Sequence, residues 1–256
     1  MTKKTLTNSI LRNIGLPLLS IALIFLLWTI IAIINNNPLV LPTPNVVFEH
    51  FILLFCKLKF WKSVGATLLR TLISFLISFS FAIISAILSK HYNNIKLILF
   101  PIISILRSAP TVVVILIAYA FMNSNTMSVV VGILIAFPIM YASFLNALDG
   151  LNPDLFKMAN VYKFSIWDKI VNIYILSILS NIFDTAKATI SLTFKIIIAA
   201  EILTYVPTSI GGEVQTAYAS FEIGYLLAWA LVAITFGFIL EIIISLLKKF
   251  IVRWKI

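Results

Sequence analysis

The stretch Asn152–Asp168, NPDLFKMANVYKFSIWD, is the only long polar interruption in the second half of an otherwise apolar chain. Asn152 is a preferred helix N-cap, and Pro153 suits the first helical position. The apolar residues that follow recur at helical spacing, at Leu155, Met158, Ala159 and Tyr162. The pattern predicts a short helix with one apolar stripe.

A second helix start lies at the end of the same stretch. Ser165 and Asp168 stand in the Ser-x-x-acid spacing of a capping box, directly before another apolar run. The whole stretch therefore predicts a compact helix-turn-helix, carried between two membrane segments and presenting an apolar face to water. Such a face typically fits into the groove of a partner.

The composition around this stretch indicates an integral membrane protein. Of the 256 residues, 61% are hydrophobic and 11% are charged, whereas soluble domains contain about 25% charged residues. Several runs approach or exceed the ~20 apolar residues that span a bilayer. The net charge of +10 does not indicate nucleic-acid binding, because no basic stripe with interleaved aromatic residues is present.

The apolar runs predict an all-α polytopic membrane protein with six transmembrane helices. The first run follows a basic start and lacks a small-x-small cleavage site, so we interpret it as a retained anchor and not a signal peptide. A segment with lysines among aromatic residues, near 51–62, predicts a helix in the plane of the interface. The six expected spans are 16–34, 64–89, 97–121, 127–147, 185–204 and 223–247.

The distribution of basic residues predicts the orientation of the spans. With the N-terminus inside, only Lys57, Lys59 and Lys62 fall in outer loops, and Lys187 lies at an inner membrane edge. The bias places both termini and the Asn152–Asp168 element in the cytoplasm. The cytoplasmic basic residues are Lys3, Lys4, Arg12, Lys90, Lys96, Lys157, Lys163, Lys169, Lys248, Lys249, Arg253 and Lys255.

Two segments predict departures from straight spans. Pro101 and Pro110 break the third span, with Arg107 between them, so this span is expected to face the bundle interior. The apolar segment 169–183 runs into charged residues, which predicts an elbow along the inner surface before the fifth span turns outward.

No catalytic or metal-binding set is visible in the sequence. The phosphate-binding loop Gly-x-x-x-x-Gly-Lys is absent, and His50 and His91 lie in different loops. We therefore expect no cofactor bound by this chain, no metal site and no ATP hydrolysis. If the protein pumps, its energy comes from another subunit or from an ion gradient.

Several motifs resemble the membrane subunits of binding-protein-dependent ABC importers, type I, in the branch that handles nitrate, sulfonates and taurine. The resemblance covers about residues 38–255. The motifs are Leu41-Pro42-Thr43-Pro44 followed by Val46, Val47 and Phe48; Thr67-Leu68-Leu69-Arg70; Ile105 to Pro110; Ala200-Glu201-Ile202; and Ile210-Gly211-Gly212.

The cytoplasmic element is similar to the ATPase-docking loop of that family, whose consensus is Glu-Ala-Ala, three residues, Gly, nine residues and Ile-x-Leu-Pro. Lys157-Met158-Ala159 occupies the first positions, Lys163 the glycine position, and Ile173 to Leu176 the last. The glycine permits a tight turn, so its replacement by Lys163 implies a different turn or an adapted partner. The resemblance implies ATPase coupling by Asn152, Pro153, Leu155, Lys157, Met158, Ala159, Tyr162, Lys163 and Ser165.

Four ionisable residues are expected within the spans, where a cation at mid-bilayer costs about 2.5–3.5 kcal/mol. Arg70 is expected to snorkel to the outer surface, and Arg107 either lines the pathway or caps backbone carbonyls. Lys195 lies near mid-membrane and either lines a path for an anion or pairs with carbonyls or an acid such as Glu241. Glu201, with Gly211 and Gly212 in the following loop, is either a gate or docking residue or a satisfied helix-end carboxylate.

The resemblance predicts a permease subunit of an importer in the cytoplasmic (inner) membrane. Its partners are an ABC ATPase, with ATP and Mg on that subunit, a solute-binding protein, a second permease copy or paralogue, and the lipid bilayer. The expected organisation is an anchor and interfacial segment (1–62), a transmembrane core (63–248) that contains the 152–168 loop, and a cytoplasmic tail (249–256). The alternatives are an ion-coupled secondary transporter and a non-transporting receptor or assembly factor.

Overall fold

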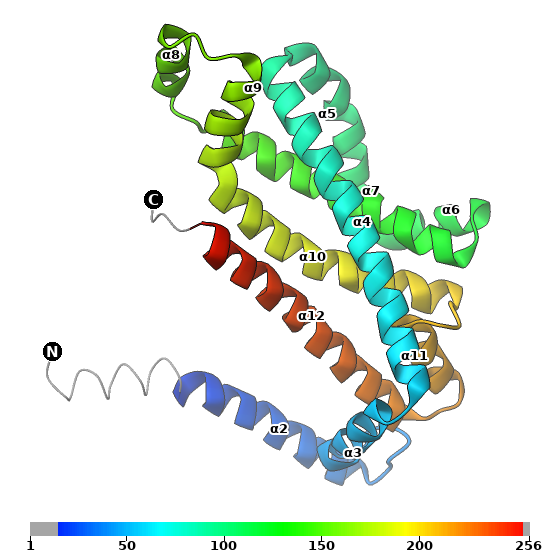
Figure 1. Ribbon diagram of the computed structural model, residues 1–256. Coiled ribbons are helices and arrows are strands. Elements are labelled where there is room, and N and C mark those ends of the chain that lie inside the picture. Colours follow the sequence, from blue (N-terminus) through cyan, green and yellow to red (C-terminus); the bar gives the residue numbers. More distant parts are fainter. Residues whose placement is uncertain (1–14, 253–256) are drawn as a thin grey trace, which may run out of the picture. The chain divides into compact units, whose positions relative to one another are not determined.

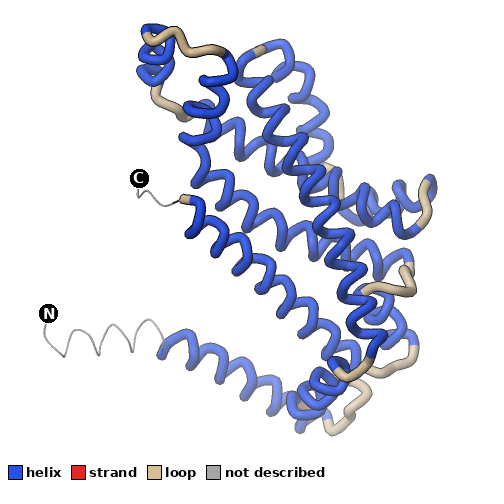
Figure 2. Tube along the Cα trace, viewed as in Figure 1, coloured by secondary structure: helices blue, strands red, loops and turns tan. Residues whose placement is uncertain are grey.

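The computed structural model describes residues 15–252, and these residues form helices joined by short loops, without a strand (Figure 2). The basic N-terminal residues and residues 253–256 of the expected tail lie outside the described range. In chain order the elements are α2 (Leu16–Asn35), α3 (Pro44–Phe55), α4 (Leu58–His91), α5 (Asn93–Ser108), α6 (Thr111–Phe121), α7 (Ser124–Asp149), α8 (Pro153–Val161), α9 (Ile166–Lys169), the π-helical segment η2 (Ile170–Ile175), α10 (Leu176–Thr204), α11 (Ile210–Ala219) and α12 (Ile223–Ile251) (Figure 1).

The chain forms two compact units, and the first comprises Met1–Phe60 and Val214–Val232. Within it the indole Nε1 of Trp28 on α2 donates to the carbonyl of Pro42 at 3.1 Å, which ties α2 to the loop before α3. Pro44 occupies the first turn of α3, where the missing N–H breaks no helical hydrogen bond. The expected interfacial segment divides here, because α3 ends at Phe55 and the lysine-rich part begins α4.

The second unit comprises Trp61–Glu213 and Ala233–Ile256, and its centre is the packing of α7 against α10. Its core includes Ile115 and Ala118 of α6, Met127 and Val131 of α7, and Ile196 and Ala200 of α10, all buried. Gly132 permits a close approach between α7 and α4, because a Cβ there would lie 2.8 Å from the hydroxyl of Ser74. The packing of these helices holds the residues of the candidate sites in position.

Four helices are long and apolar enough to cross a membrane, namely α2, α4, α7 and α12, and the bent pair α5–α6 makes a fifth when counted as one span. Each of the six expected spans coincides with a helix or helix pair, but the fifth does not pass this test. Helix α10 carries Asp184, Lys187, Lys195 and Glu201, which lower its hydropathy. The described residues therefore support four or five spans by composition, and not the expected six.

The expected break in the third span is present, but one proline causes it and not two. Helices α5 and α6 meet at an angle of 102°. Pro101 stays inside α5, whereas Pro110 lies at the start of α6 and ends the preceding helix. The residue before a proline disfavours the helical region, and Ala109 accordingly adopts an extended conformation at φ −67° and ψ 130°.

The segment 169–183, which was predicted to form an elbow along the inner surface, is helical throughout. Helix α9, η2 and α10 follow one another without a non-helical residue from Ile166 to Thr204. The six residues of η2 are a π-helical insertion, a feature that is frequent at functional sites and adds a local irregularity to an otherwise continuous helix. The element at 152–168 is thus joined directly to the helix that carries Lys195 and Glu201.

Candidate functional site

The first half of the helix-turn-helix begins at the predicted cap. The Asn152 side-chain oxygen accepts a hydrogen bond from the Asp154 amide at 2.9 Å, and the Asn152 carbonyl accepts one from Leu155 at 3.2 Å. Asp154 lies in the first turn, where a negative charge complements the helix dipole, and it pairs with Lys157 at 2.8 Å. Both charged side chains are exposed, so this pair contributes little stability.

Lys163 makes the turn between the two helices in the left-handed conformation, at φ 53°. The Phe164 amide reaches back to the Ala159 carbonyl at 2.9 Å, which is the hydrogen bond of a Schellman-type helix end. Lys163 thus adopts the left-handed backbone conformation that a glycine adopts without strain. The turn has the usual geometry of a helix end, although a residue with a side chain occupies the glycine position.

The second half begins with the predicted capping box, and its hydrogen bonds are present. The Ser165 hydroxyl donates to Asp168 Oδ2 at 2.6 Å and accepts from the Asp168 amide at 3.1 Å. The Ser165 amide donates to the same carboxylate at 3.2 Å. These reciprocal bonds satisfy the free amides at the start of α9.

The predicted apolar stripe of α8 divides into a buried and an exposed part. Ala159 is fully buried and Leu155 is half-buried, whereas Met158 is 47% exposed and Tyr162 is 70% exposed. Trp167 on α9, which the stripe did not include, is 71% exposed. We call Met158, Val161, Tyr162 and Trp167 the α8–α9 apolar patch; α8 and α9 lie together at one end of the second unit (Figure 1).

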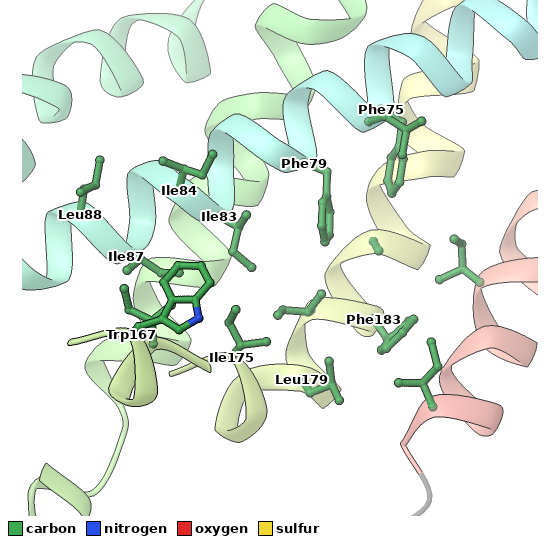
Figure 3. A pocket seen from close by; sticks show the side chains of 16 residues that line it. Phe75, Phe79, Ile83, Ile84, Ile87, Leu88, Trp167, Ile175, Leu179 and Phe183 are labelled. Atoms are coloured by element: carbon green, nitrogen blue, oxygen red, sulfur yellow. The ribbon is translucent and has the colours of Figure 1, made fainter. Parts of the chain in front are cut away.

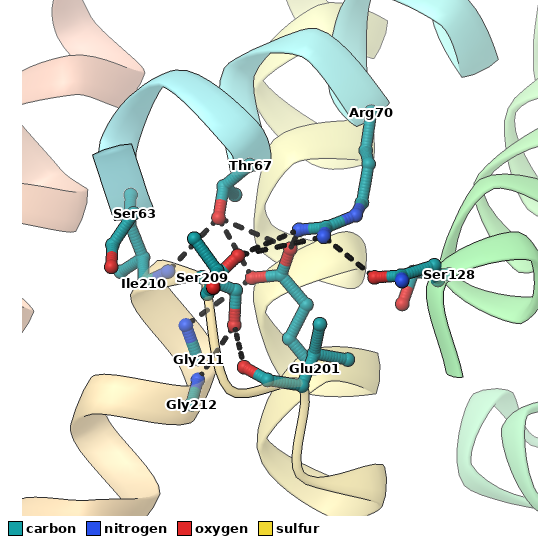
Figure 4. Close-up of polar contacts among 12 residues, drawn as sticks. Ser63, Thr67, Arg70, Ser128, Glu201, Ser209, Ile210, Gly211 and Gly212 are labelled. Atoms are coloured by element: carbon teal, nitrogen blue, oxygen red, sulfur yellow. Dashed lines mark hydrogen bonds and ion pairs between the residues drawn. The ribbon is translucent and has the colours of Figure 1, made fainter. Parts of the chain in front are cut away.

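A buried polar cluster connects α4, α10 and α11, with Glu201 at its centre (Figure 4). The Thr67 hydroxyl donates to the Glu201 carboxylate, at 3.1 and 2.9 Å from its two oxygens, and the Gly211 amide donates to Oε2 at 3.2 Å. The Ile210 amide donates to the Thr67 hydroxyl at 2.9 Å. Glu201 therefore caps the start of α11, where the helix dipole favours an anion.

Arg70 completes this cluster and does not snorkel away from it as expected. Its Nη1 lies 2.8 Å from Glu201 Oε1, and its Nη2 donates to Asn125 Oδ1 at 2.7 Å. Charged groups within a membrane protein are paired when they are buried, but this rule alone does not specify which acid pairs with Arg70. The pairing of Arg70 with Glu201 was not predicted from the sequence, in which Glu241 is the acid expected as a partner for Lys195.

Gly211 and Gly212 are required by close backbone approach. A Cβ on Gly211 would meet the Glu201 side chain and backbone atoms of Ile198 and Ile202, and a Cβ on Gly212 would meet the carbonyl of Val206. Because these two glycines have no side chain, the start of α11 can lie against the end of α10. The structure brings Glu201, Gly211 and Gly212 together. Arg107 on α5 and Lys195 on α10 are not part of this cluster.

Lys195 lies on the exposed stripe of α10, and it makes no ion pair among the described residues. The exposed positions recur at helical spacing on a helix that is otherwise buried. The predicted pairing with Glu241 is therefore not present. The stripe consists of Asp184, Lys187, Ala188, Leu192, Lys195 and Leu203.

Two further features were not predicted from the sequence. Asp149 at the end of α7 accepts hydrogen bonds from both Lys90 and Lys96 at 3.0 Å, which joins the ends of α4, α5 and α7. A groove of about 700 Å³ between α4, α10 and α12 is lined only by apolar side chains, with Trp167 at one side (Figure 3).

No group of His, Cys, Asp and Glu side chains suited to a metal ion occurs among residues 15–252.

The helices and their buried charges define a multi-pass helical membrane protein. Residues 78–253 match the family described as binding-protein-dependent transport system inner membrane component, and the chain belongs to this family. It is thus the transmembrane permease subunit of an ABC importer, as the motifs predicted.

Two curated relatives cover most of the chain. A putative ABC transporter permease protein of Methanocaldococcus jannaschii is 23% identical, over 92% of this chain and 88% of that protein. A putative aliphatic sulfonates transport permease protein of Bacillus subtilis is 21% identical, over 91% of this chain and 85% of that protein.

Two solved structures share the fold at a TM-score of 0.67. One is a bacterial ABC transporter involved in the import of the acidic polysaccharide alginate, 17% identical and covering 96% of this chain and 99% of that chain. The other is a bacterial alginate ABC transporter in complex with a pentasaccharide-bound periplasmic protein, 16% identical and covering 99% of each chain.

Proposed function

We propose that this permease spans the cytoplasmic membrane six times, with both termini inside, and that α8 and α9 dock a separate ABC ATPase. A second copy or a paralogue completes the central pathway, and a solute-binding protein delivers the solute from outside. ATP and Mg stay on the partner subunit. The exposed stripe of α10, with Lys195, lines the pathway between the two permeases.

The α8–α9 apolar patch carries this proposal. Four large apolar side chains are exposed on α8, on α9 and in the turn between them, and the starts of both helices are held by capping hydrogen bonds. An exposed apolar patch on a rigid, pre-formed element is typical of a protein interface. Coupling then follows from helix continuity, because displacement of α9 is transmitted through η2 to α10 without an intervening loop.

The geometry of Glu201 argues against the alternative of an ion-coupled transporter. Such a mechanism needs an acid within the spans that binds and releases a proton or cation. Glu201 already accepts hydrogen bonds from Arg70, Thr67 and Gly211. The Glu201 carboxylate is therefore engaged in structural hydrogen bonds. Glu241 remains, and this one acid is a weak basis for an ion relay within the spans.

ATPase docking is tested by co-purification of the chain with individual, known ABC ATPases. The full chain is co-expressed with each ABC ATPase of its source genome in turn, purified in detergent, and assayed for bound ATPase. Met158→Glu combined with Tyr162→Glu places two charges in the patch and is expected to reduce bound ATPase at least tenfold, since anchor residues of interfaces contribute about 2 kcal/mol or more.

Leu39→Glu is the matched control, because Leu39 is 68% exposed in the loop between α2 and α3, outside the patch. Unchanged binding to this variant shows that an added charge alone does not disturb the complex. Equal amounts of ATPase on the double variant and on the unmodified chain contradict docking at α8 and α9.

A further inference from the structure

The apolar groove between α4, α10 and α12 lies within the second unit and has a buried floor (Figure 3). The floor includes Phe75 of α4, Ile182 of α10 and Ile244 of α12, which are 6%, 6% and 9% exposed. Ile84 and Leu88 are exposed and form the rim along α4. The groove is therefore a hollow of about 700 Å³ between three helices, and not a flat outer surface.

The position of the groove along α4 places it in the inner half of a membrane span. Its lining on α4 runs from Phe75 to Leu88, a length of roughly 20 Å at 1.5 Å per residue. These residues belong to the second half of the span expected at 64–89, and one leaflet supplies about half of the ~30 Å hydrocarbon core. Trp167 lines the groove near Leu88 (Figure 3), and tryptophan is enriched at the depth of the headgroups. The groove is thus long enough for an acyl chain of one leaflet.

The lining restricts what can fill this space. All of the lining side chains are hydrophobic, so a peptide segment without regular structure would leave its backbone N–H and C=O groups unsatisfied there. A helix satisfies its own backbone, but 20 Å of helix with a diameter of about 10 Å occupies roughly 1,600 Å³, more than twice the volume of the groove. A hydrocarbon chain meets both limits, because it has no polar group and is narrower than a helix.

A basic residue of α12 lies on the face that lines the groove. Lys248 comes four residues after Ile244 and three before Ile251, which both line the groove, so it shares their face of α12. Its Nζ lies 2.7 Å from both carboxylate oxygens of Asp184 on α10, so this lysine is paired. Lys249, which follows it in the last turn of α12, is exposed. The inner end of α12 therefore brings positive charge to the edge of the groove.

The sequence that follows adds positive charge and no acid. Four basic residues fall within eight positions, and no Asp or Glu occurs after Glu241. With Asp184 included, this stretch has a surplus of three positive charges. Groups of four or more Lys and Arg at the cytoplasmic end of a membrane helix are typical of binding to anionic lipids. The four residues are Lys248, Lys249, Arg253 and Lys255.

We propose that the α4–α10–α12 groove binds an anionic phospholipid of the inner leaflet, with one acyl chain along Phe75 and Ile244 and its phosphate at the last turn of α12. Burial of the chain against apolar side chains supplies affinity that any phospholipid shares. The surplus of positive charge attracts the phosphate and favours anionic over zwitterionic headgroups. This inference goes beyond the proposed function, and of that function it uses only the orientation of the chain in the membrane.

The test is photolabelling of the full chain in nanodiscs of phosphatidylcholine that contain a trace of phosphatidylglycerol with a diazirine in one acyl chain. Labelled peptides are mapped by mass spectrometry, and a phosphatidylcholine probe with the same acyl chain is the reference. The peptides that contain 75–88 and 179–186 are expected to prefer the phosphatidylglycerol probe at least tenfold, since each basic residue near the surface contributes about fivefold. Equal labelling by the two probes overturns the inference.

Two matched pairs of variants separate the groove from the surrounding surface. Ala186→Phe fills the groove from α10 and is expected to remove the label from 75–88, whereas Ala188→Phe, at an exposed position of the same helix, is expected to leave it in place. Lys249→Met is expected to lower the preference for phosphatidylglycerol about fivefold. Lys62→Met, which removes an exposed lysine at the other end of α4, is expected to leave this preference unchanged.

A further variant keeps the outcome decisive if Ala186→Phe does not fold. Ile84→Trp narrows the groove from its rim, at a position that is 57% exposed, and is also expected to reduce the label on 75–88. Unchanged labelling in both Ala186→Phe and Ile84→Trp overturns the inference. A groove that takes up label only after dimers are dissociated is covered by a second copy of the chain, and this result overturns it as well.

Failure of this inference is distinguishable from failure of the proposed function. A chain that recruits its ATPase but is labelled equally by both lipids loses only the lipid site. A chain that binds phosphatidylglycerol in the groove but recruits no ATPase loses the coupling and keeps the lipid site.

Discussion

Arg70 on α4 and Glu201 on α10 form an ion pair of 2.8 Å across 131 positions of sequence, and the Glu201 side chain is fully buried. The pair is part of a cluster that also holds the turn between α10 and α11, through the amides of Ile210 and Gly211. One carboxylate thereby fixes the ends of three helices relative to one another. The first two predictions below test this cluster.

Removing one partner of the Arg70–Glu201 pair leaves an uncompensated charge. Arg70→Met or Glu201→Gln is expected to destabilise the protein by about 3–5 kcal/mol, and the double variant by less than the sum. Thermal unfolding in detergent measures the difference. Lys90→Met is the control, since its pair with Asp149 is partly exposed and is expected to contribute about 0–1 kcal/mol. Additive losses in the cycle contradict a direct Arg70–Glu201 interaction.

Methyl groups at the two glycines of α11 are expected to be strongly destabilising. Gly211→Ala and Gly212→Ala place a Cβ against backbone atoms, which cannot move as a flexible side chain can, so a loss of about 1–3 kcal/mol or more is expected. Gly65→Ala, where a Cβ meets nothing within 4 Å, is the matched control and is expected to stabilise α4 by about 0.5–1 kcal/mol. Similar melting temperatures for all three variants refute the steric argument.

A glycine at position 163 is expected to relieve strain in the turn between α8 and α9. Lys163 has a φ of 53°, so Lys163→Gly is expected to stabilise the element by about 1 kcal/mol. Hydrogen exchange of the α8 amides measures this change. Lys163→Ala keeps the Cβ and the strain, so it is expected to give no such gain; equal protection in the two variants points to the lysine charge instead of the backbone.

Neutralising Lys195 tests whether the exposed stripe of α10 lines the pathway. If an anion passes Lys195, Lys195→Met is expected to lower the apparent affinity for transport about fivefold to tenfold, through loss of a favourable charge interaction. Uptake into vesicles, with binding protein and ATPase present, is the measurement. Lys62→Met is again the control for loss of an exposed positive charge. An unchanged affinity removes Lys195 from the pathway.

Local signals in the sequence were sufficient for the helix-turn-helix and the membrane helices. The caps at Asn152 and Ser165 depend on hydrogen bonds within three residues, so their spacing alone predicts them. The break at Pro110 is likewise a property of one residue and its predecessor. The predicted number of six spans was not confirmed by composition, because the charges on α10 lower its hydropathy even though it is a long, largely buried helix.

The amino-acid sequence by itself determined the class of protein, the helices and the caps of the cytoplasmic element, since periodicity, hydropathy and capping act over a few residues. Only the tertiary structure decided which charges meet. Arg70 finds Glu201, Asp149 joins Lys90 and Lys96, and Arg107 and Lys195 have no counter-charge among residues 15–252. The reason is physical: an ion pair depends on the separation of two side chains in space, and that separation is set by the packing of helices distant in sequence.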